Sequence, residues 1–184
     1  AAYASHKKTG VQTGETLAIF GLGGLGQYAI QIAKLAGVRV IAVDISDEKL
    51  ATATTLGADE VVVADKNAGA AIQALGGVQG CVNFAPVGAT WPLMLAACNP
   101  RATIVLTAVP ADQLAFYTYE VVERGLKVIG SSASNRQEMN ELLALAAGGN
   151  VKGVINTMPF EKINDALSNL AEGRTEGRTV IDLQ

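Results

Sequence analysis

The sequence predicts an α/β fold, a doubly wound parallel sheet of about six strands with helices on both faces. Short runs rich in β-branched residues alternate with stretches of helical period from Thr16 onward, as in successive strand–helix–strand units. A glycine-rich turn joins the first of these strands to the first of these helices. Only 17% of the 184 residues are charged, which fits strands that are buried on both faces or a surface that meets another domain.

Six short apolar segments, each bounded by turn residues, are predicted to form the strands of this sheet. They are residues 17–20, 39–43, 60–63, 80–84, 103–107 and 127–130. Beyond them the sequence predicts a helix at 136–147, a strand at 154–158, a helix at 160–171 and a strand at 178–183. We therefore expect a domain of residues 1–150 that contains the sheet and a C-terminal extension of residues 151–184.

Two of the connecting helices carry clear start and stop signals. Residues 24–36 repeat apolar side chains at helical period along one face, and Gly37 ends that helix. The apolar positions are Leu25, Tyr28, Ala29, Ile32, Ala33 and Ala36. The next helix starts at Ser46, whose hydroxyl can cap free backbone amides, and Gly57 supplies its left-handed stop.

Residues 19–26, IFGLGGLG, place a GxGxxG motif where the first strand meets the first helix. Gly21 permits the tight turn, Gly23 lets the backbone approach a pyrophosphate, and Gly26 lets the helix pack closely on the strand. The helix start at Gly24 and Leu25 offers backbone amides and the positive end of the helix dipole to phosphates. In this context the motif predicts a Rossmann-type site for a dinucleotide.

Asp44 ends the second strand, where its carboxylate can accept hydrogen bonds from the ribose hydroxyls of NAD and repel the 2′-phosphate of NADP. Lys49 either reaches the same ribose as a second donor or is a solvated helix lysine. Two alternatives remain: a methyltransferase site for S-adenosylmethionine, and a glycine turn with a purely structural role. Gly26 and the apolar helix that follows it favour the dinucleotide.

The chain closely resembles the zinc-type, medium-chain alcohol dehydrogenases. The likeness is strongest in KKTGVQTGETLAIFGLGGLGQYAIQIAKLAGVRVIAVDISDEKL and extends through CVNFAPVGA, NPRATIVLTAVP, LKVIGSSASNRQEM and EGRTEGRTVIDLQ. Zinc-free quinone and enoyl reductases of that superfamily usually carry Ala where Gly21 stands. The sequence is therefore more similar to the zinc-dependent branch.

This resemblance implies the positions of further cofactor contacts. Backbone groups near Phe84, Ala108, Val109 and Ser131 would line the nicotinamide pocket. Arg136 would bind the pyrophosphate through its planar guanidinium, the alternative being an ordinary exposed helix residue. In that family the final strand, residues 178–183, belongs to the catalytic domain. No catalytic residue is expected within this chain.

The resemblance also implies a reaction and its partners. The parent enzyme would transfer hydride between an alcohol or aldehyde and NAD, with zinc as Lewis acid. Its zinc ligands would lie outside this chain, in an N-terminal catalytic domain and just before Ala1, and homo-oligomers would form through sheet edges. His6 matches no zinc ligand and is expected at the surface. Cys81 and Cys98 are expected to be structural thiols.

Composition narrows the class of partner and leaves three functions open. The net charge of −3 disfavours nucleic acid, and the longest uncharged stretches are interrupted by Gly and Gln or by Pro and Asn, which disfavours a membrane span. No signal segment is recognisable, so a cytoplasmic location is expected. The open functions are the NAD-binding part of a zinc-dependent alcohol dehydrogenase, a free-standing NAD-binding or sensing module, and a zinc-free quinone or enoyl reductase.

Overall fold

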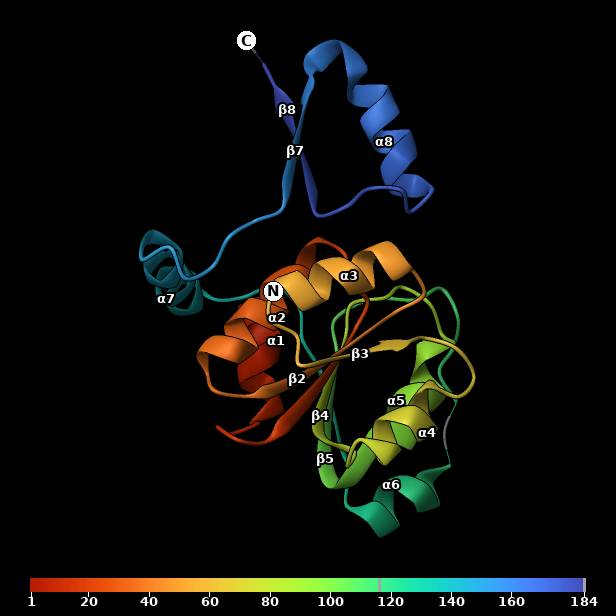
Figure 1. Ribbon diagram of the computed structural model, residues 1–184. Coiled ribbons are helices and arrows are strands. Elements are labelled where there is room, and N and C mark those ends of the chain that lie inside the picture. The colour runs from red at the N-terminus through yellow and green to blue at the C-terminus, as the bar shows by residue number, and fades with distance from the viewer. Residues whose placement is uncertain (116, 184) are drawn as a thin grey trace.

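A six-stranded parallel sheet forms the centre of the structure, a computed structural model that describes residues 1–115 and 117–183 (Figure 1). The strands are β1 (Thr16–Phe20), β2 (Arg39–Asp44), β3 (Glu60–Val63), β4 (Val78–Asn83), β5 (Cys98–Leu106) and β6 (Lys127–Gly130). Their order in the sheet is β3-β2-β1-β4-β5-β6, and every neighbouring pair is parallel. Strands β2 and β3 are thus added on one side of β1, and strands β4, β5 and β6 on the other side, so the strand order reverses between β1 and β4. A crevice for ligands is expected at that switch point.

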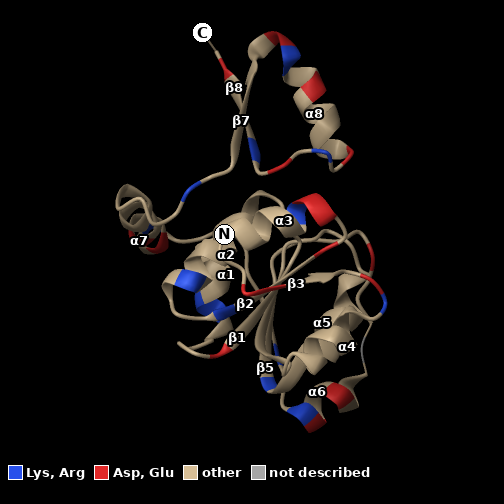
Figure 2. Cartoon of the chain, in the orientation of Figure 1, with Lys and Arg blue, Asp and Glu red and all other residues tan. Residues whose placement is uncertain are grey.

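Helices cover both faces of the sheet, as predicted. Alternate residues of β1 point in opposite directions, so Leu17 and Ile19 join one buried cluster while Ala18 and Phe20 join the other. The first cluster packs under α1 (Ala2–Thr9), α2 (Gly24–Leu35), α3 (Asp47–Thr55) and α7 (Arg136–Ala147). The second packs under α4 (Ala68–Ala74), α5 (Thr90–Ala97) and α6 (Thr118–Arg124). Figure 2 shows that the strands between these layers carry few charged residues.

The helix signals in the sequence correspond to observed caps. The Ser46 hydroxyl accepts a hydrogen bond from the Lys49 amide at 3.4 Å, and Gly57 adopts the left-handed φ of +100° after α3. Asn135 and Glu138 form a capping box at the start of α7. The predicted bounds of α7, β3 and β6 are those observed.

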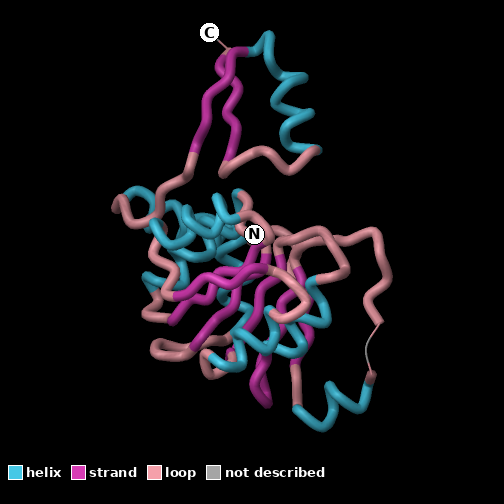
Figure 3. The backbone as a smooth tube through the Cα atoms, turned by 45° about the vertical axis from the view of Figure 1, so that its right-hand side comes forward, coloured by secondary structure: helices cyan, strands magenta, loops and turns pink. Residues whose placement is uncertain are grey.

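The C-terminal extension forms a lobe outside the main sheet (Figures 1 and 3). It consists of β7 (Ile155–Pro159), a 3-10 turn (Phe160–Lys162), α8 (Ile163–Ala171) and β8 (Arg178–Asp182), and β7 pairs in parallel with β8. The Gln31 side chain of α2 exchanges two hydrogen bonds with the backbone of Lys152, at 2.8 and 2.9 Å. Thr52 of α3 also donates to the Glu176 carboxylate. The lobe is therefore tied to the face that carries α2 and α3.

Several elements differ from the sequence-based expectation. Helices α1, α4 and α6 were not predicted, because they are short and α1 and α4 are rich in alanine, serine and glycine rather than in large apolar residues. Helix α5 was expected only as a helix that ends at Cys98, which is its observed C-cap. Strand β5 begins at Cys98 rather than at residue 103, since its early residues continue directly from α5. Gln184, the last residue of the predicted extension, lies outside the described residues. Within the described part of the chain, no helix combines the length and apolar character needed to cross a membrane.

Candidate functional site

The glycine loop follows β1 and turns sharply against the end of β4. Gly21 has a φ of +88°, a conformation that side chains disfavour, and its amide donates to the Val43 carbonyl oxygen at 2.9 Å. A Cβ at Gly21 would lie 2.6 Å from the backbone nitrogen of Ala85. The loop is therefore held between the ends of β2 and β4, and the first glycine is required by both the turn and the close approach.

The other two glycines of the motif differ in what surrounds them. A Cβ at Gly26 would collide with the carbonyl oxygen of Gly21, so this glycine permits the close packing of α2 on the loop. A Cβ at Gly23 would meet nothing within 4 Å, and its φ of −68° is open to any residue. Gly23 instead lines a cavity. Its missing side chain leaves room for a ligand rather than for another part of the protein.

Asp44 joins the glycine loop to the next loop from the end of β2. Its Oδ2 accepts a hydrogen bond from the Leu22 amide at 2.7 Å, and its Oδ1 accepts one from the Ser46 amide at 3.1 Å. The side chain is only 8% exposed, yet it lines the same cavity as Gly23. Each carboxylate oxygen can accept a second hydrogen bond, so Asp44 can hold the loop and also receive hydroxyl donors.

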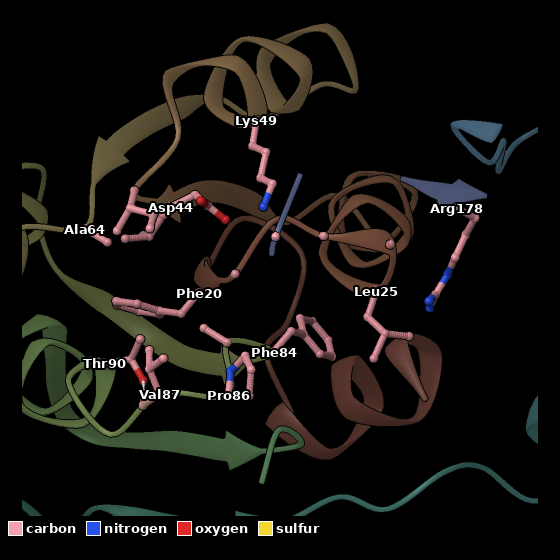
Figure 4. A pocket seen from close by; sticks show the side chains of 17 residues that line it. Phe20, Leu25, Asp44, Lys49, Ala64, Phe84, Pro86, Val87, Thr90 and Arg178 are labelled. Carbon is pink, nitrogen blue, oxygen red and sulfur yellow. Dashed lines mark hydrogen bonds between the residues drawn. The ribbon is translucent and has the colours of Figure 1, made fainter. Parts of the chain in front are cut away.

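These residues surround a cavity of about 500 Å³, which we call the glycine-loop cavity (Figure 4). The Lys49 side chain extends from α3 over it beside Asp44, and Phe84 and Thr90 lie on the opposite wall. Its apolar lining also includes Phe20, Val43, Ala64, Pro86 and Val87. A positive helix end, a carboxylate and an apolar slot suit a ligand that carries phosphate, sugar and an aromatic base.

A second cavity of about 870 Å³, the strand-end cavity, lies over the ends of β5 and β6. Its lining contains three of the predicted nicotinamide-pocket residues, Ala108, Val109 and Ser131, together with Thr107. The fourth, Phe84, lines the glycine-loop cavity instead. Leu25 lines both cavities, so they adjoin at the start of α2. The two cavities together offer an elongated ligand a path across the switch point of the sheet.

The structure brings Arg178 to this site and does not bring Arg136. Arg136 is the exposed first residue of α7 and lines neither cavity. Arg178, at the start of β8, lines the glycine-loop cavity, and a Cβ on Gly24 would collide with its guanidinium (Figure 4). No local pattern in the sequence indicates Arg178, because only the return of the C-terminal lobe over α2 places it there.

His6, expected at the surface, is half-buried in α1 instead. Its Nδ1 is buried without a hydrogen-bond partner among the described residues, and burial lowers the pKa of the imidazole. Cys81 and Cys98 are buried free thiols with their sulfurs 3.6 Å apart, and burial raises the pKa of the Cys81 thiol. Within residues 1–115 and 117–183, no three His, Cys, Asp or Glu side chains cluster as a metal site. The described residues therefore do not fit a zinc ion.

Comparison with known proteins assigns the chain to a family. The sequence model of the zinc-binding dehydrogenase family matches residues 24–148, from the start of α2 to the residue after α7. The chain belongs to the zinc-binding dehydrogenase family. Within this family, an alcohol dehydrogenase of Geobacillus stearothermophilus is 37% identical over 182 residues, which make up 97% of this chain and 54% of that protein.

Solved structures show the same fold. The crystal structure of the alcohol dehydrogenase of Aeropyrum pernix superposes with a TM-score of 0.94 at 31% identity, over 99% of this chain and 54% of that one. The acetophenone reductase of Geotrichum candidum, solved in complex with NAD, gives a TM-score of 0.86 at 25% identity, over 98% of this chain and 52% of that one. The chain thus spans about half the length of these relatives.

Proposed function

We propose that this chain is the NAD-binding part of an alcohol dehydrogenase that transfers hydride between an alcohol or aldehyde and NAD. The observation that carries the proposal is the open position at Gly23, between the N-terminus of α2 and the Asp44 carboxylate. A pyrophosphate fits beside Gly23, where helix amides face it, and ribose hydroxyls fit against Asp44. NAD itself supplies the hydride chemistry, while the chain binds and orients it.

Different residues of the site bind the phosphates, the ribose and the adenine of the cofactor. Gly23, Gly24 and Leu25 present the backbone at the start of α2 to the phosphates, and Arg178 adds a guanidinium beside them. Asp44 accepts from the adenosine ribose, and Lys49 donates to it. The adenine lies against the apolar wall that contains Phe84, and the same wall leads toward the second cavity.

The strand-end cavity receives the nicotinamide. Ala108, Val109 and Ser131 lie on it, and Val109 is 87% exposed, so the chain leaves one side of this cavity open. Substrate and zinc would approach from that open side on the catalytic domain implied by the family. The chain provides the floor of the reaction site rather than the group that activates the alcohol.

Residues 1–150 form the NAD-binding domain in this proposal, and residues 151–184 return to the catalytic domain. Large apolar side chains of the lobe support this, because Phe160, Leu167 and Leu170 are 55, 58 and 61% exposed. The edge strand β6 is the proposed contact in a homo-oligomer, since its outer edge is unpaired within the described sheet. A monomeric mass by light scattering would contradict that contact.

The experiment that tests the cofactor site compares Arg178 with a nearby arginine. Arg178→Ala should weaken NAD and ADP-ribose by about 10-fold or more, because charge-assisted hydrogen bonds to the pyrophosphate are lost. Arg174→Ala is the matched control and should bind as the wild type, because Arg174 lies in the loop before β8 and is bonded to Asn169 and Glu172. Titration calorimetry of the full 184-residue chain measures both. Equal affinities for all three proteins would refute the site.

A free-standing module that senses NAD makes a different prediction about catalysis. If the chain is part of an alcohol dehydrogenase, the chain alone binds NAD but forms no NADH from alcohols, and the longer protein forms it. NADH absorbance at saturating NAD distinguishes the two. An alcohol-inactive longer protein that binds NAD would favour the sensor.

A further inference from the structure

A cluster of three hydroxyls lies directly behind the strand-end cavity. Ser5 of α1 is fully buried, and its Oγ lies 2.8 Å from Thr107 Oγ1 and 3.2 Å from Ser131 Oγ. Thr107 and Ser131 are the first residues after β5 and β6, and both line the cavity, whereas Ser5 does not. The three side chains come from three elements that are distant in sequence. We call them the hydroxyl cluster.

The hydroxyl cluster continues the pairing of β5 and β6 beyond the end of the sheet. The last ladder pair is Leu106 with Gly130, and the Ser131 amide then donates to the Leu106 carbonyl oxygen at 2.8 Å. After that bond the two chains separate into loops, and Ser5 is the group that joins their first side chains. Beyond that backbone bond, the Ser5 hydroxyl links the first side chains of the two loops.

The proton count of the hydroxyl cluster defines the roles of its members. Ser5 has one proton, which it gives to Ser131 or to the Ala1 carbonyl oxygen at 3.0 Å. Either hydroxyl can donate in the contact between Ser5 and Thr107, and Thr107 is the donor whenever the Ser5 proton is used in one of the other two contacts. Because Ser5 is fully buried, losing its hydroxyl would leave the Thr107 hydroxyl without this partner and free to rotate into the cavity.

We propose that Ser5 is a positioning residue for the nicotinamide end of NAD, acting through Thr107 and Ser131 on the floor of the strand-end cavity. The inference rests on the proposed function, since it assigns that cavity to the nicotinamide. Ser5 holds the two loops at the spacing that the ring and its carboxamide require. It has no contact with the glycine-loop cavity, where ADP-ribose binds.

Because the residues that Ser5 contacts line one cavity and not the other, its loss should weaken NAD but not ADP-ribose, whereas a general loss of stability would weaken both. Ser5→Ala and Thr107→Val should each weaken NAD by about 3- to 10-fold, the effect of one or two neutral hydrogen bonds, and leave ADP-ribose within about twofold. The NAD affinity of the double variant should equal that of the single variant with the lower affinity, because both changes break the same link. Thr103→Val is the matched control, since Thr103 is a buried threonine within β5 that lines neither cavity.

Calorimetric titration of the full chain measures the affinities of each variant for NAD and for ADP-ribose. Unchanged NAD affinity in the single variants, an equal loss of NAD and ADP-ribose, or additive losses in the double variant would each overturn the role of Ser5. If Ser5→Ala fails to fold, Thr107→Val against Thr103→Val decides, because both conserve shape. A wild-type chain that binds neither ligand would instead refute the proposed function.

Discussion

Gly23 and Gly26 stand three residues apart in one motif, and the structure predicts opposite consequences for replacing them by alanine. At Gly23 the new Cβ meets no protein atom within 4 Å, and the backbone φ of −68° suits alanine. The free energy of unfolding should therefore change by less than about 1 kcal/mol. The methyl group would, however, project into the glycine-loop cavity, which Gly23 lines.

The expected loss of NAD affinity follows from the contacts that the methyl group displaces. A pyrophosphate beside Gly23 accepts charge-assisted hydrogen bonds from the helix start, each worth about 1.5–3 kcal/mol. Loss of one of them weakens binding by about 10- to 100-fold. Calorimetric titration with NAD measures this, and thermal unfolding in the absence of NAD confirms that Gly23→Ala is as stable as the wild type.

Gly26→Ala is the matched control with the opposite pattern. Its Cβ would collide with the Gly21 carbonyl oxygen, so the loop and α2 must separate, and overpacking of this kind costs about 1–3 kcal/mol or more. Gly26→Ala should therefore lower the melting temperature, which Gly23→Ala should not. Gly23→Ala that binds NAD as tightly as the wild type would refute the reasoning, because the cofactor would then lie elsewhere.

Three further changes test individual side chains. Asp44→Asn keeps an acceptor for the Leu22 amide but removes the charge, so it should weaken NAD by about 10-fold and leave NADP unchanged or tighter; a parallel loss of both cofactors would contradict the ribose role. Ser46→Ala should destabilise the chain by about 1 kcal/mol through loss of the α3 cap, measured by denaturant unfolding, and an unchanged midpoint would contradict the cap. Burial lowers the pKa of His6, so the unfolded chain binds the proton more tightly and stability should fall as the pH drops through the unfolded value near 6.5. Since His6 is the one histidine of the sequence, His6→Gln should flatten the stability profile between pH 7 and 5.5, and an unaltered slope would contradict its burial.

The sequence predicted the sheet because the signals for it are local. Buried parallel strands are continuous apolar runs, and helix α2 repeats its apolar residues at helical period. Turns of defined chemistry separate them, as at Ser46 and Gly57, where the observed caps match the expectation. Short alanine-rich helices such as α1 and α4 lack these signals, since packing rather than periodicity stabilises them.

The glycine motif and Asp44 were recognisable because their spacing along the chain reflects one strand–helix–strand unit. Arg178 has no such local signal, because its place beside Gly24 depends on how the C-terminal lobe returns over α2. The resemblance to alcohol dehydrogenases implied Arg136 for the pyrophosphate, but Arg136 lies on an exposed helix start away from both cavities.

The sequence alone therefore determined the fold class, the glycine loop and the acidic end of β2, because periodicity and turn chemistry act over a few residues. Only the tertiary structure decided which side chains meet, Arg178 over the helix start and Ser5 between Thr107 and Ser131, and that His6 is half-buried. Such contacts join residues that are far apart in the chain. They arise from the packing of whole elements, which no local pattern in the sequence specifies.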